Sequence, residues 1–375
     1  MKKRKAKIVY CILAMILAAL MITGLAACGA GGDDAGTGGK TLVYGSGDYT
    51  AINPALYEHG EINLLLFIGL TAHDAENNIV PAAAESWTYD EATYTYTFTM
   101  RDGLTFHDGE PLTASDVKFT IEAIMDPDNG SENASNFEDV ESVTVIDDAH
   151  AAIKLTAPNV AILDYLTIGI LPEHLLSGKD IATDSFNQNP VGAGPYKLAD
   201  WDFGQSITLE KFDDFYLGAP KIDTVIFKIV PDNDARALQL KSGELDFAQV
   251  TPKATADFED LDGFKVYKMD TADYRGIMYN FNSDFFKKHR ELPNILSYAI
   301  DRQSIVDSVL LGYGEAAYSP LQAGAYNNAD IERFEYDPDK ACLLYTSCSF
   351  SWALDLHHLH QFLQIMLLRG CTFRR

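Results

Sequence analysis

The chain has 375 residues, a length that favours more than one domain, and carries 54 acidic against 29 basic residues, a formal net charge of −25 at pH 7. Residues 28–341 are more acidic still, with 53 acidic and 21 basic side chains. This balance argues against nucleic acid as a partner, because phosphate binding needs a basic surface. We interpret the charge as a solvated surface that keeps the protein soluble, in preference to a site for a cationic ligand.

The amino-terminal region combines basic, apolar and small residues in the order of a secretory signal peptide. Five basic residues within positions 2–7 precede the apolar run 8–22, and Leu25-Ala26-Ala27 lead to Cys28. A transmembrane helix is the alternative, but the run is shorter than the roughly 20 residues that a bilayer span needs. Leu-Ala-Ala-Cys resembles a bacterial lipobox, which implies cleavage after residue 27, acylation of Cys28 and a location on the outer face of the cell membrane. Glycine-rich residues 28–39 predict a flexible tether.

Hydrophobic periodicity predicts a mixture of strands and helices along the body of the chain, and hence an α/β or α+β fold. The clearest strand is residues 92–100, in which four aromatic or apolar side chains alternate with four threonines. The clearest helix follows Thr113, which forms a capping box with Asp116, and Asp126-Pro127 ends it. The apolar stripe of this helix is Val117, Ile121, Ile124 and Met125. The other expected strands are 41–45, 140–146, 151–156, 222–230, 245–250 and 275–282, and the other expected helices are 54–70, 234–242 and 292–311.

The sequence motifs favour binding over catalysis. Gly45-Ser46-Gly47 does not match the G-x-S-x-G nucleophile elbow. Pro195 follows Gly192-Ala193-Gly194, so no helix can begin there as a dinucleotide-binding motif requires. Residues 107–110 (HDGE) are better interpreted as a turn than as a metal site, because Asp-Gly is typical of turns. We therefore expect no catalytic residue, no cofactor and no metal site, and we treat a surface hydrolase as the less favoured alternative.

The last 34 residues differ in composition from the body. Residues 29–341 contain no cysteine, whereas Cys342, Cys348 and Cys371 follow within 342–375, and only one acidic residue remains. The closely spaced histidines of 357–360 (HHLH) could be metal ligands, or the segment could be an amphipathic terminal helix. We favour a third interpretation, that 342–375 is not native sequence, and we place no function on its histidines.

Four stretches, read in order, carry a family resemblance. They are residues 68–127, 190–201 (PVGAGPYKLADW), 230–250 (VPDNDARALQLKSGELDFAQV) and 296–320. Together they resemble the bacterial extracellular solute-binding proteins of family 5, the receptors of peptide and nickel ATP-binding-cassette (ABC) importers. The resemblance spans about residues 40–341 and stops after YDPDKA (336–341), which favours a truncation at this point.

The resemblance implies a type II periplasmic-binding-protein-like clamp of α/β class with two lobes and an inserted subdomain. Lobe I is expected from residues 40–72 and 190–272, and the inserted subdomain from 73–189. Lobe II begins at 273 and is incomplete, with only 273–341 present. Ligand is expected between the lobes, which close over it at a hinge, because contacts to both faces exist only in the closed form.

The resemblance also implies where ligand would lie. A receptor that reads an extended peptide needs strand edges and loop amides, because the peptide exposes main-chain donors and acceptors. The loop after the first strand, the end of a later strand and the segment that crosses between the lobes are therefore expected to face the cleft. The expected ligand-binding residues are Ser46, Gly47, Asp48, Tyr49, Gln249, Val250, Tyr274, Tyr279 and Asn282.

The function that the resemblance implies is capture of di- or oligopeptides outside the cell and their delivery to a membrane permease with its ATPase. The expected partners are a small-molecule ligand, this permease and membrane lipid through Cys28, and the receptor is expected to be a monomer. A nickel chelate or an oligosaccharide is the alternative ligand, because fold does not fix ligand.

Overall fold

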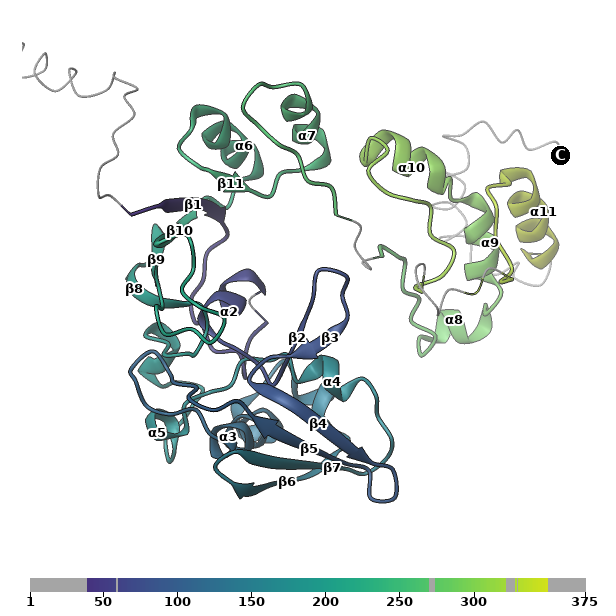
Figure 1. Ribbon diagram of the computed structural model, residues 1–375. Helices are drawn as coiled ribbons and strands as arrows, with labels where there is room; N and C mark the ends of the chain where they lie inside the picture. The colour runs from purple at the N-terminus through teal and green to yellow at the C-terminus, as the bar shows by residue number, and fades with distance from the viewer. Residues whose placement is uncertain (1–38, 59, 270–273, 322–327, 329, 350–375) are drawn as a thin grey trace, which may run out of the picture. The chain divides into compact units, whose positions relative to one another are not determined.

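The computed structural model describes residues 39–58, 60–269, 274–321, 328 and 330–349 (Figure 1). The chain divides into two compact units. The first contains Ile52–Ala199 and Thr208–Val225 besides the stretch that ends at Thr41, and the second contains Leu42–Ala51, Asp200–Ile207 and the chain from Ile226 onward. Among the helices of the described part, none combines the length and the apolar character that a bilayer span requires.

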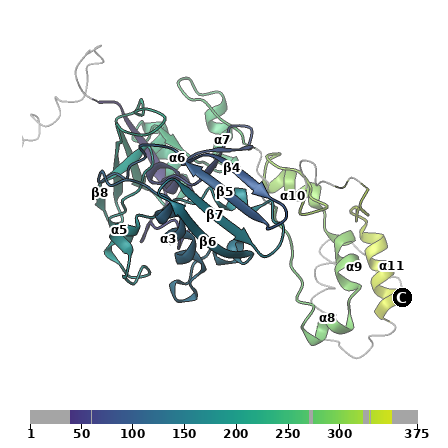
Figure 2. The same cartoon turned by 60° about the horizontal axis from the view of Figure 1, so that its bottom comes forward.

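The first unit is built around a four-stranded antiparallel sheet in the order β4-β5-β7-β6 (Figure 2). Helix α3 (Ala114–Met125) packs against β6 and β7. The central strand β5 pairs with β4 on one side and β7 on the other, so that Phe98 lies opposite Trp87 and Ala151. The strands are β4 (Ala84–Asp90), β5 (Thr95–Met100), β6 (Val140–Asp147) and β7 (His150–Leu155).

Two local predictions in this unit are confirmed, each with one residue wrong. In β5, Tyr96, Phe98 and Met100 are buried as the alternation predicted, but Tyr94 lies before the strand, in a turn, with a positive φ of 54°. In α3, the capping box of Thr113 and Asp116 is present. Met125 was predicted to lie on the buried stripe but is 37% exposed, because the helix ends there and the backbone is extended at Asp126.

The predicted helix 54–70 is wrong in extent, because only α2 (Gly60–Leu66) is helical. The carbonyl oxygens that a longer helix would use instead accept hydrogen bonds from N–H groups of distant residues. Leu66 O accepts from Gly194 N–H at 2.9 Å, and Ile68 O accepts from Ile170 N–H at 2.9 Å. A helix cannot continue where its i to i+4 acceptors are occupied in this way.

Glycines allow this close approach of three chain segments. A Cβ on Gly192 would lie 1.9 Å from Leu66 O, and one on Gly194 would lie 2.5 Å from Leu65 O. His107 holds the same glycine loop from the other side: its Nδ1 accepts from Gly192 N–H at 3.2 Å, and its Nε2 donates to Gly194 O at 3.1 Å. These bonds require the neutral ring with its proton on Nε2, and burial lowers the pKa of His107 to about 4. The predicted HDGE turn is therefore part of a packed junction.

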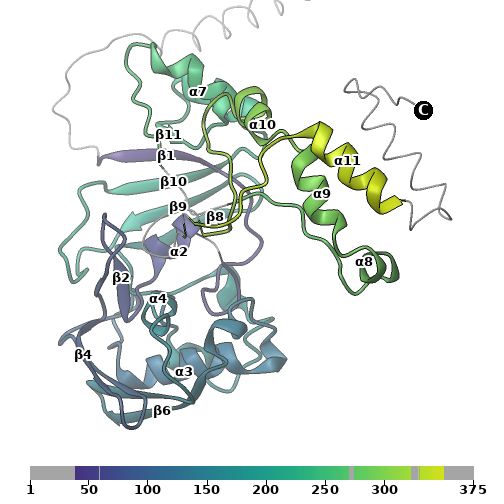
Figure 3. The same ribbon diagram turned by 90° about the vertical axis from the view of Figure 1, so that its right-hand side faces the viewer.

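The second unit contributes three strands that run in one direction: β1 (Thr41–Ser46), β10 (Thr224–Ile229) and β11 (Phe247–Ala248). β1 pairs in parallel with β11, with Gly45 opposite Ala248. Thr224 N–H donates to Lys40 O, and Val230 N–H donates to Ser46 O. Residue numbers therefore increase in the same direction along both strands, so β1 and β10 are also parallel. Figure 3 shows the full order β11-β1-β10-β9-β8, with β9 (Ser206–Lys211) and β8 (Tyr196–Asp202) beyond β10.

Helix α6 (Asn233–Ser242) follows β10, and α7 (Pro252–Glu259) follows β11. The predicted helix 234–242 is confirmed: Asp232 caps its start, and Gly243 in the left-handed region ends it. The predicted strand 245–250 shrinks to two residues, because Thr251 caps α7 directly after it.

Two predictions beyond residue 273 are wrong. Residues 275–282 form no strand, and no strand partner for them exists in the described part of the chain. The expected helix 292–311 is divided into α9 (Leu292–Ala299) and α10 (Arg302–Val309), because the Asp301 carboxylate accepts from Ser304 N–H at 2.9 Å and starts a new helix. Ile295, Tyr298 and Ala341 form a small core with α11 (Pro338–Ser349).

The remaining elements are short. They are β2 (Thr71–His73), β3 (Ile79–Pro81), α4 (Ile162–Tyr165), α5 (Glu173–Leu176), α8 (Asp284–Lys288) and the 3-10 turns Pro127–Asn129, Ala134–Phe137 and Ser185–Gln188.

Candidate ligand-binding site

The three parallel strands of the second unit end at one edge of the sheet. The last residues of β1, β10 and β11 are Ser46, Ile229 and Ala248. Each strand is followed at this edge by a loop or by the start of a helix (Figure 3). In open α/β sheets, ligands bind outside the carboxyl ends of parallel strands, where such loops gather. This edge is therefore the candidate site.

The structure brings six of the predicted residues to this edge. Ser46 is buried, and its hydroxyl bonds to the Tyr49 hydroxyl at 3.2 Å. Gly47 and Asp48 are exposed between them. Gln249 and Val250 directly follow β11, which pairs with β1, so they lie beside the loop of residues 46–49. The parallel pairing of β1 and β11 brings the two predicted groups together.

Aromatic rings fix the strand ends beneath this edge. The Tyr44 ring stacks on the Phe247 ring with centroids 5.5 Å apart, and it also meets the Phe227 ring edge-on at 5.3 Å. Tyr49 also meets Phe227 edge-on, at 6.3 Å. Such contacts hold Tyr49 in one orientation beside the exposed Asp48. The edge thus presents hydroxyl, carboxylate and main-chain groups on a rigid support.

Arg236 is the residue of this edge that the sequence analysis missed. Its side chain is buried, and its Nε and Nη2 donate to Val230 O at 3.1 and 2.9 Å. Its Nη1 also approaches Gln249 O, at 3.5 Å. An arginine in a polar helix is ordinarily an exposed residue, and the apolar Leu238 of the same helix is 68% exposed here. Nothing in the local pattern indicated this exchange.

Tyr274, Tyr279 and Asn282 were predicted to bind ligand from the segment that crosses between the lobes. Tyr279 and Asn282 contact residues close to them in sequence. The Tyr279 ring meets the Phe286 ring at 5.3 Å, and burial raises the pKa of its hydroxyl. Asn282 N–H donates to the Asn280 side chain at 3.0 Å, and Tyr274 is 51% exposed. Their placement at the ligand stays a prediction. Cys28 and the histidines of 357–360 lie outside the described residues.

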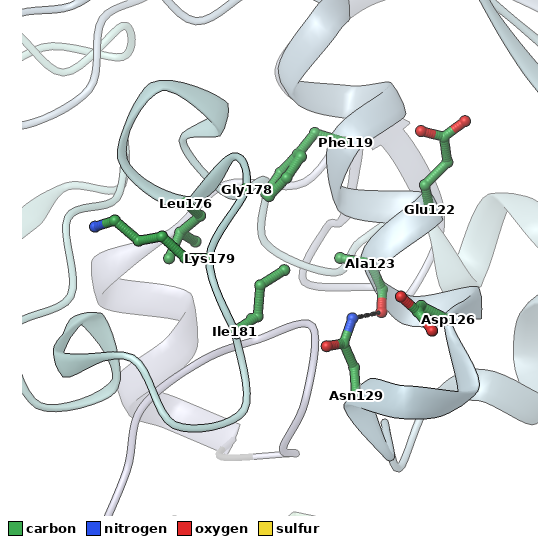
Figure 4. A pocket seen from close by; sticks show the side chains of 9 residues that line it. All are labelled: Phe119, Glu122, Ala123, Asp126, Asn129, Leu176, Gly178, Lys179 and Ile181. Carbon is green, nitrogen blue, oxygen red and sulfur yellow. Dashed lines mark hydrogen bonds between the residues drawn. The ribbon is translucent and has the colours of Figure 1, made fainter.

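A small pocket lies elsewhere, in the first unit (Figure 4). It has a volume of about 240 Å³, and Phe119, Leu176 and Ile181 face one another across it. The charged side chains at its rim have partners outside it: Lys179 pairs with Asp184 at 3.6 Å, and Glu122 with Lys118 at 3.8 Å. None of the predicted ligand-binding residues lines this pocket. Its full lining is Phe119, Glu122, Ala123, Asp126, Asn129, Leu176, Gly178, Lys179 and Ile181.

The described residues contain no cluster of three or more His, Cys, Asp or Glu side chains arranged to hold a metal ion. Within the same residues, the edge of the sheet offers hydrogen-bonding groups and aromatic support. This arrangement is suited to holding a polar solute.

Comparison with known proteins identifies close relatives. The family model described as "Bacterial extracellular solute-binding proteins, family 5 Middle" matches residues 78–355. The oligopeptide-binding protein AppA of Bacillus subtilis is 33% identical over 317 residues, which cover 81% of this chain and 58% of AppA. The glutathione-binding protein GsiB of Pectobacterium atrosepticum is 28% identical and is covered to 53%. The chain thus spans little more than half the length of these curated relatives.

Solved structures give the same picture. NikZ from Campylobacter jejuni, in complex with Ni(L-His), has a TM-score of 0.77 and 35% identity, with 82% of this chain and 63% of NikZ covered. AppA from Bacillus subtilis, in complex with a nonapeptide, has a TM-score of 0.74 and 33% identity, with 82% of this chain and 64% of AppA covered. These similarities confirm the predicted fold class, an α/β protein of the type II periplasmic-binding-protein kind.

Proposed function

Because the chain belongs to the bacterial extracellular solute-binding proteins of family 5, we propose that it is the solute receptor of an ABC importer and captures peptides outside the cell. The observation that carries the proposal is the edge where β1 and β11 end together, with residues 46–49 beside Gln249 and Val250. The receptor closes at a hinge around its ligand and passes it to a permease with its ATPase. The solute leaves chemically unchanged.

A peptide suits this edge for a physical reason. An extended peptide offers main-chain donors and acceptors whatever its side chains are, and strand ends with loop amides can pair with them. Variable side chains then need only hydrated space, where water adapts to each one. The relative AppA was solved with a nonapeptide, which supports this class of ligand.

A nickel chelate is the second candidate ligand. The observation that favours it is the likeness to NikZ, which was solved with Ni(L-His). In such a complex the chelator supplies metal ligands, so a receptor needs few of its own. A surface hydrolase is the candidate from another class, and it predicts product formation from peptides, which a receptor does not.

The predicted position at the membrane belongs to the same proposal. Acylated Cys28 anchors the receptor at the outer face of the cell membrane, and residues 28–39 are the tether. Two or more acyl chains give stable anchoring, whereas one gives only marginal binding. We further propose that the receptor acts as a monomer, with lobe I from residues 40–72 and 190–272, the subdomain from 73–189 and lobe II from 273. The proposal assigns no role to 342–375.

Calorimetric titration of the full chain tests the ligand class. The probes are a nonapeptide, glutathione and Ni(L-His), each with a product analysis after incubation. We expect the nonapeptide to bind and to be recovered intact. Tight binding of Ni(L-His), with no binding of either peptide, would identify the nickel chelate as the ligand. Cleavage of the peptide during incubation would identify the protein as a hydrolase.

Removal of the Tyr49 hydroxyl tests whether the ligand binds at this edge. Tyr49→Phe removes a group at the edge and should weaken nonapeptide binding about two- to tenfold, the usual value of one hydrogen bond. Tyr89→Phe is the matched control, because it removes the same hydroxyl from a tyrosine on β4 of the first unit, which is not part of the edge. Equal loss in both variants would contradict the placement of the site.

A further inference from the structure

Arg236 is a buried cation without an anionic partner. Its side chain is nine-tenths buried. Within the described residues, no carboxylate lies at ion-pair distance from its guanidinium, and its hydrogen bonds go to main-chain carbonyls. Burying an isolated charge is costly unless polar groups replace its water. The carbonyl oxygen of Val230, with two bonds at 2.9 and 3.1 Å, is the main replacement here.

The same side chain contacts the ends of all three parallel strands. The two short bonds hold Val230, the residue after β10. The longer bond reaches Gln249, the residue after β11. Its aliphatic stem lies against β1, since a Cβ on Gly45 would come within 3.0 Å of the Arg236 Cγ. A planar guanidinium donates in several fixed directions, so it can fix two loops at once.

The bonds to Arg236 also change what the edge offers to a ligand. They occupy carbonyl oxygens of Val230 and Gln249. By contrast, in the described part of the chain the main-chain N–H groups of Gly47, Asp48 and Val250 make no hydrogen bond. These N–H groups are donors that the edge can offer to a ligand, beside the exposed carboxylate of Asp48.

We propose that Arg236 is a positioning residue for the solute site, and that the edge it organises binds an acceptor group of the ligand, a carbonyl or carboxylate oxygen. Arg236 acts through Val230 and Gln249 and does not touch the ligand. The second part of the proposal rests on the solute-binding function, whereas the first does not. The chemistry follows from complementarity: free N–H donors require acceptors.

The first arm of the test needs no ligand. Two variants of the full chain are compared with the wild type. Arg236→Met keeps an apolar side chain and removes the hydrogen-bond donors, and Arg236→Lys keeps the positive charge on one ammonium group. Lys241→Met on the same helix is the matched control, because Lys241 is exposed and pairs with Asp257 at 2.7 Å. The readouts are the carbonyl carbon chemical shifts of Val230 and Gln249 and the exchange rate of Val230 N–H, which bonds to Ser46 O.

We expect Arg236→Met to move both carbonyl shifts and to speed exchange at Val230 about tenfold, the effect of one lost charged hydrogen bond. Arg236→Lys should restore the Val230 signal and leave Gln249 displaced, since one ammonium cannot span both carbonyls. The control should match the wild type at both positions. Unchanged signals at Val230 and Gln249 in Arg236→Met, at equal global stability, would overturn the positioning role.

The second arm measures binding. Arg236→Met should weaken nonapeptide binding about tenfold or more, with partial recovery in Arg236→Lys. A backbone analogue of the nonapeptide in which carbonyls are reduced to methylenes should lose affinity for the wild type and show little further loss with Arg236→Met. Equal affinity of wild type and Arg236→Met would overturn the inference. A wild type that binds no peptide would overturn the proposed function, and the first arm would still decide the role of Arg236.

Discussion

Strand β5 and the segment 274–282 have different fates, although residues 92–100 and 275–282 were both predicted as strands. In β5, aromatic or apolar residues alternate with threonines, and in the second segment Ile277, Tyr279 and Phe281 recur at every second position. In β5, Tyr96, Phe98 and Met100 are at most 6% exposed, between β4 and β7. In 274–282, Ile277 and Met278 are 65% and 95% exposed, and the segment forms no ladder in the described residues. A segment with a strand-like sequence thus forms a strand only where a second segment pairs with it, because its backbone N–H and C=O groups need hydrogen-bond partners.

The packing of the first unit depends on close backbone contacts that tolerate no added atom. Gly192→Ala should have the largest effect, because its Cβ would lie 1.9 Å from Leu66 O. We expect the first unit to lose more than about 4 kcal/mol of unfolding free energy or to accumulate no folded protein. Thermal and denaturant unfolding measure this.

Gly60→Ala is the control for that substitution, because a Cβ there meets nothing within 4 Å. It should leave the unfolding free energy within about 0.5 kcal/mol of the wild type. A folded Gly192→Ala protein with the same stability as Gly60→Ala would show that the loop at Gly192 adjusts freely.

The contrast between β5 and 274–282 can be measured directly with one pair of substitutions. Phe98 is fully buried and Phe281 is 44% exposed. Phe98→Ala should cost about 3–5 kcal/mol of unfolding free energy, from lost burial and the cavity left behind. Phe281→Ala should cost much less, about 0.5 kcal/mol or below. Comparable losses would mean that 274–282 is packed as well as β5 is.

The junction held by His107 should make the first unit sensitive to acid. The pKa of His107 in the folded protein, about 4, lies below the ordinary histidine value of 6.5, so the unfolded chain binds the proton more readily. The stability contributed by neutral His107 is therefore complete above pH 6.5 and is lost as the pH falls from 6.5 to about 4. The loss amounts to at most about 3 kcal/mol.

His107→Gln checks this effect, because an amide can still donate and accept but does not titrate. The difference in unfolding free energy between wild type and variant, measured from pH 7.5 to 4, should change most between pH 6.5 and 4. A constant difference over this range would rule out His107 as the titrating group. Lys197 and Asp108 are the charged neighbours that influence the ring.

Local sequence signals predicted local structure well. The capping box at Thr113, the helix 234–242 and the strands 140–146 and 151–156 depend on residues within a few positions of one another. The resemblance to family 5 is confirmed for the same reason, since its stretches are continuous in sequence and the family model matches residues 78–355. Six of the predicted site residues lie at one edge, because each ends β1 or follows the end of β1 or β11 within three residues, and their contact with a ligand stays a prediction.

The structure alone decided where elements stop and which polar groups are buried. Helix α2 ends at Leu66 because Gly194, 128 positions later, bonds to its carbonyl. Arg236 is buried because carbonyls after two different strands replace its water. Gly194 is far from α2 in sequence, and Arg236 meets both Val230 and Gln249 only because β10 and β11 belong to one sheet, so local periodicity indicates neither arrangement. The sequence by itself determined the types of most elements, their caps and the family, which rest on short-range preferences. The fate of 275–282, the element lengths, the junction at His107 and the burial of Arg236 were decided only by tertiary contacts, because the free energy of a backbone or buried polar group depends on the partner that folding brings to it.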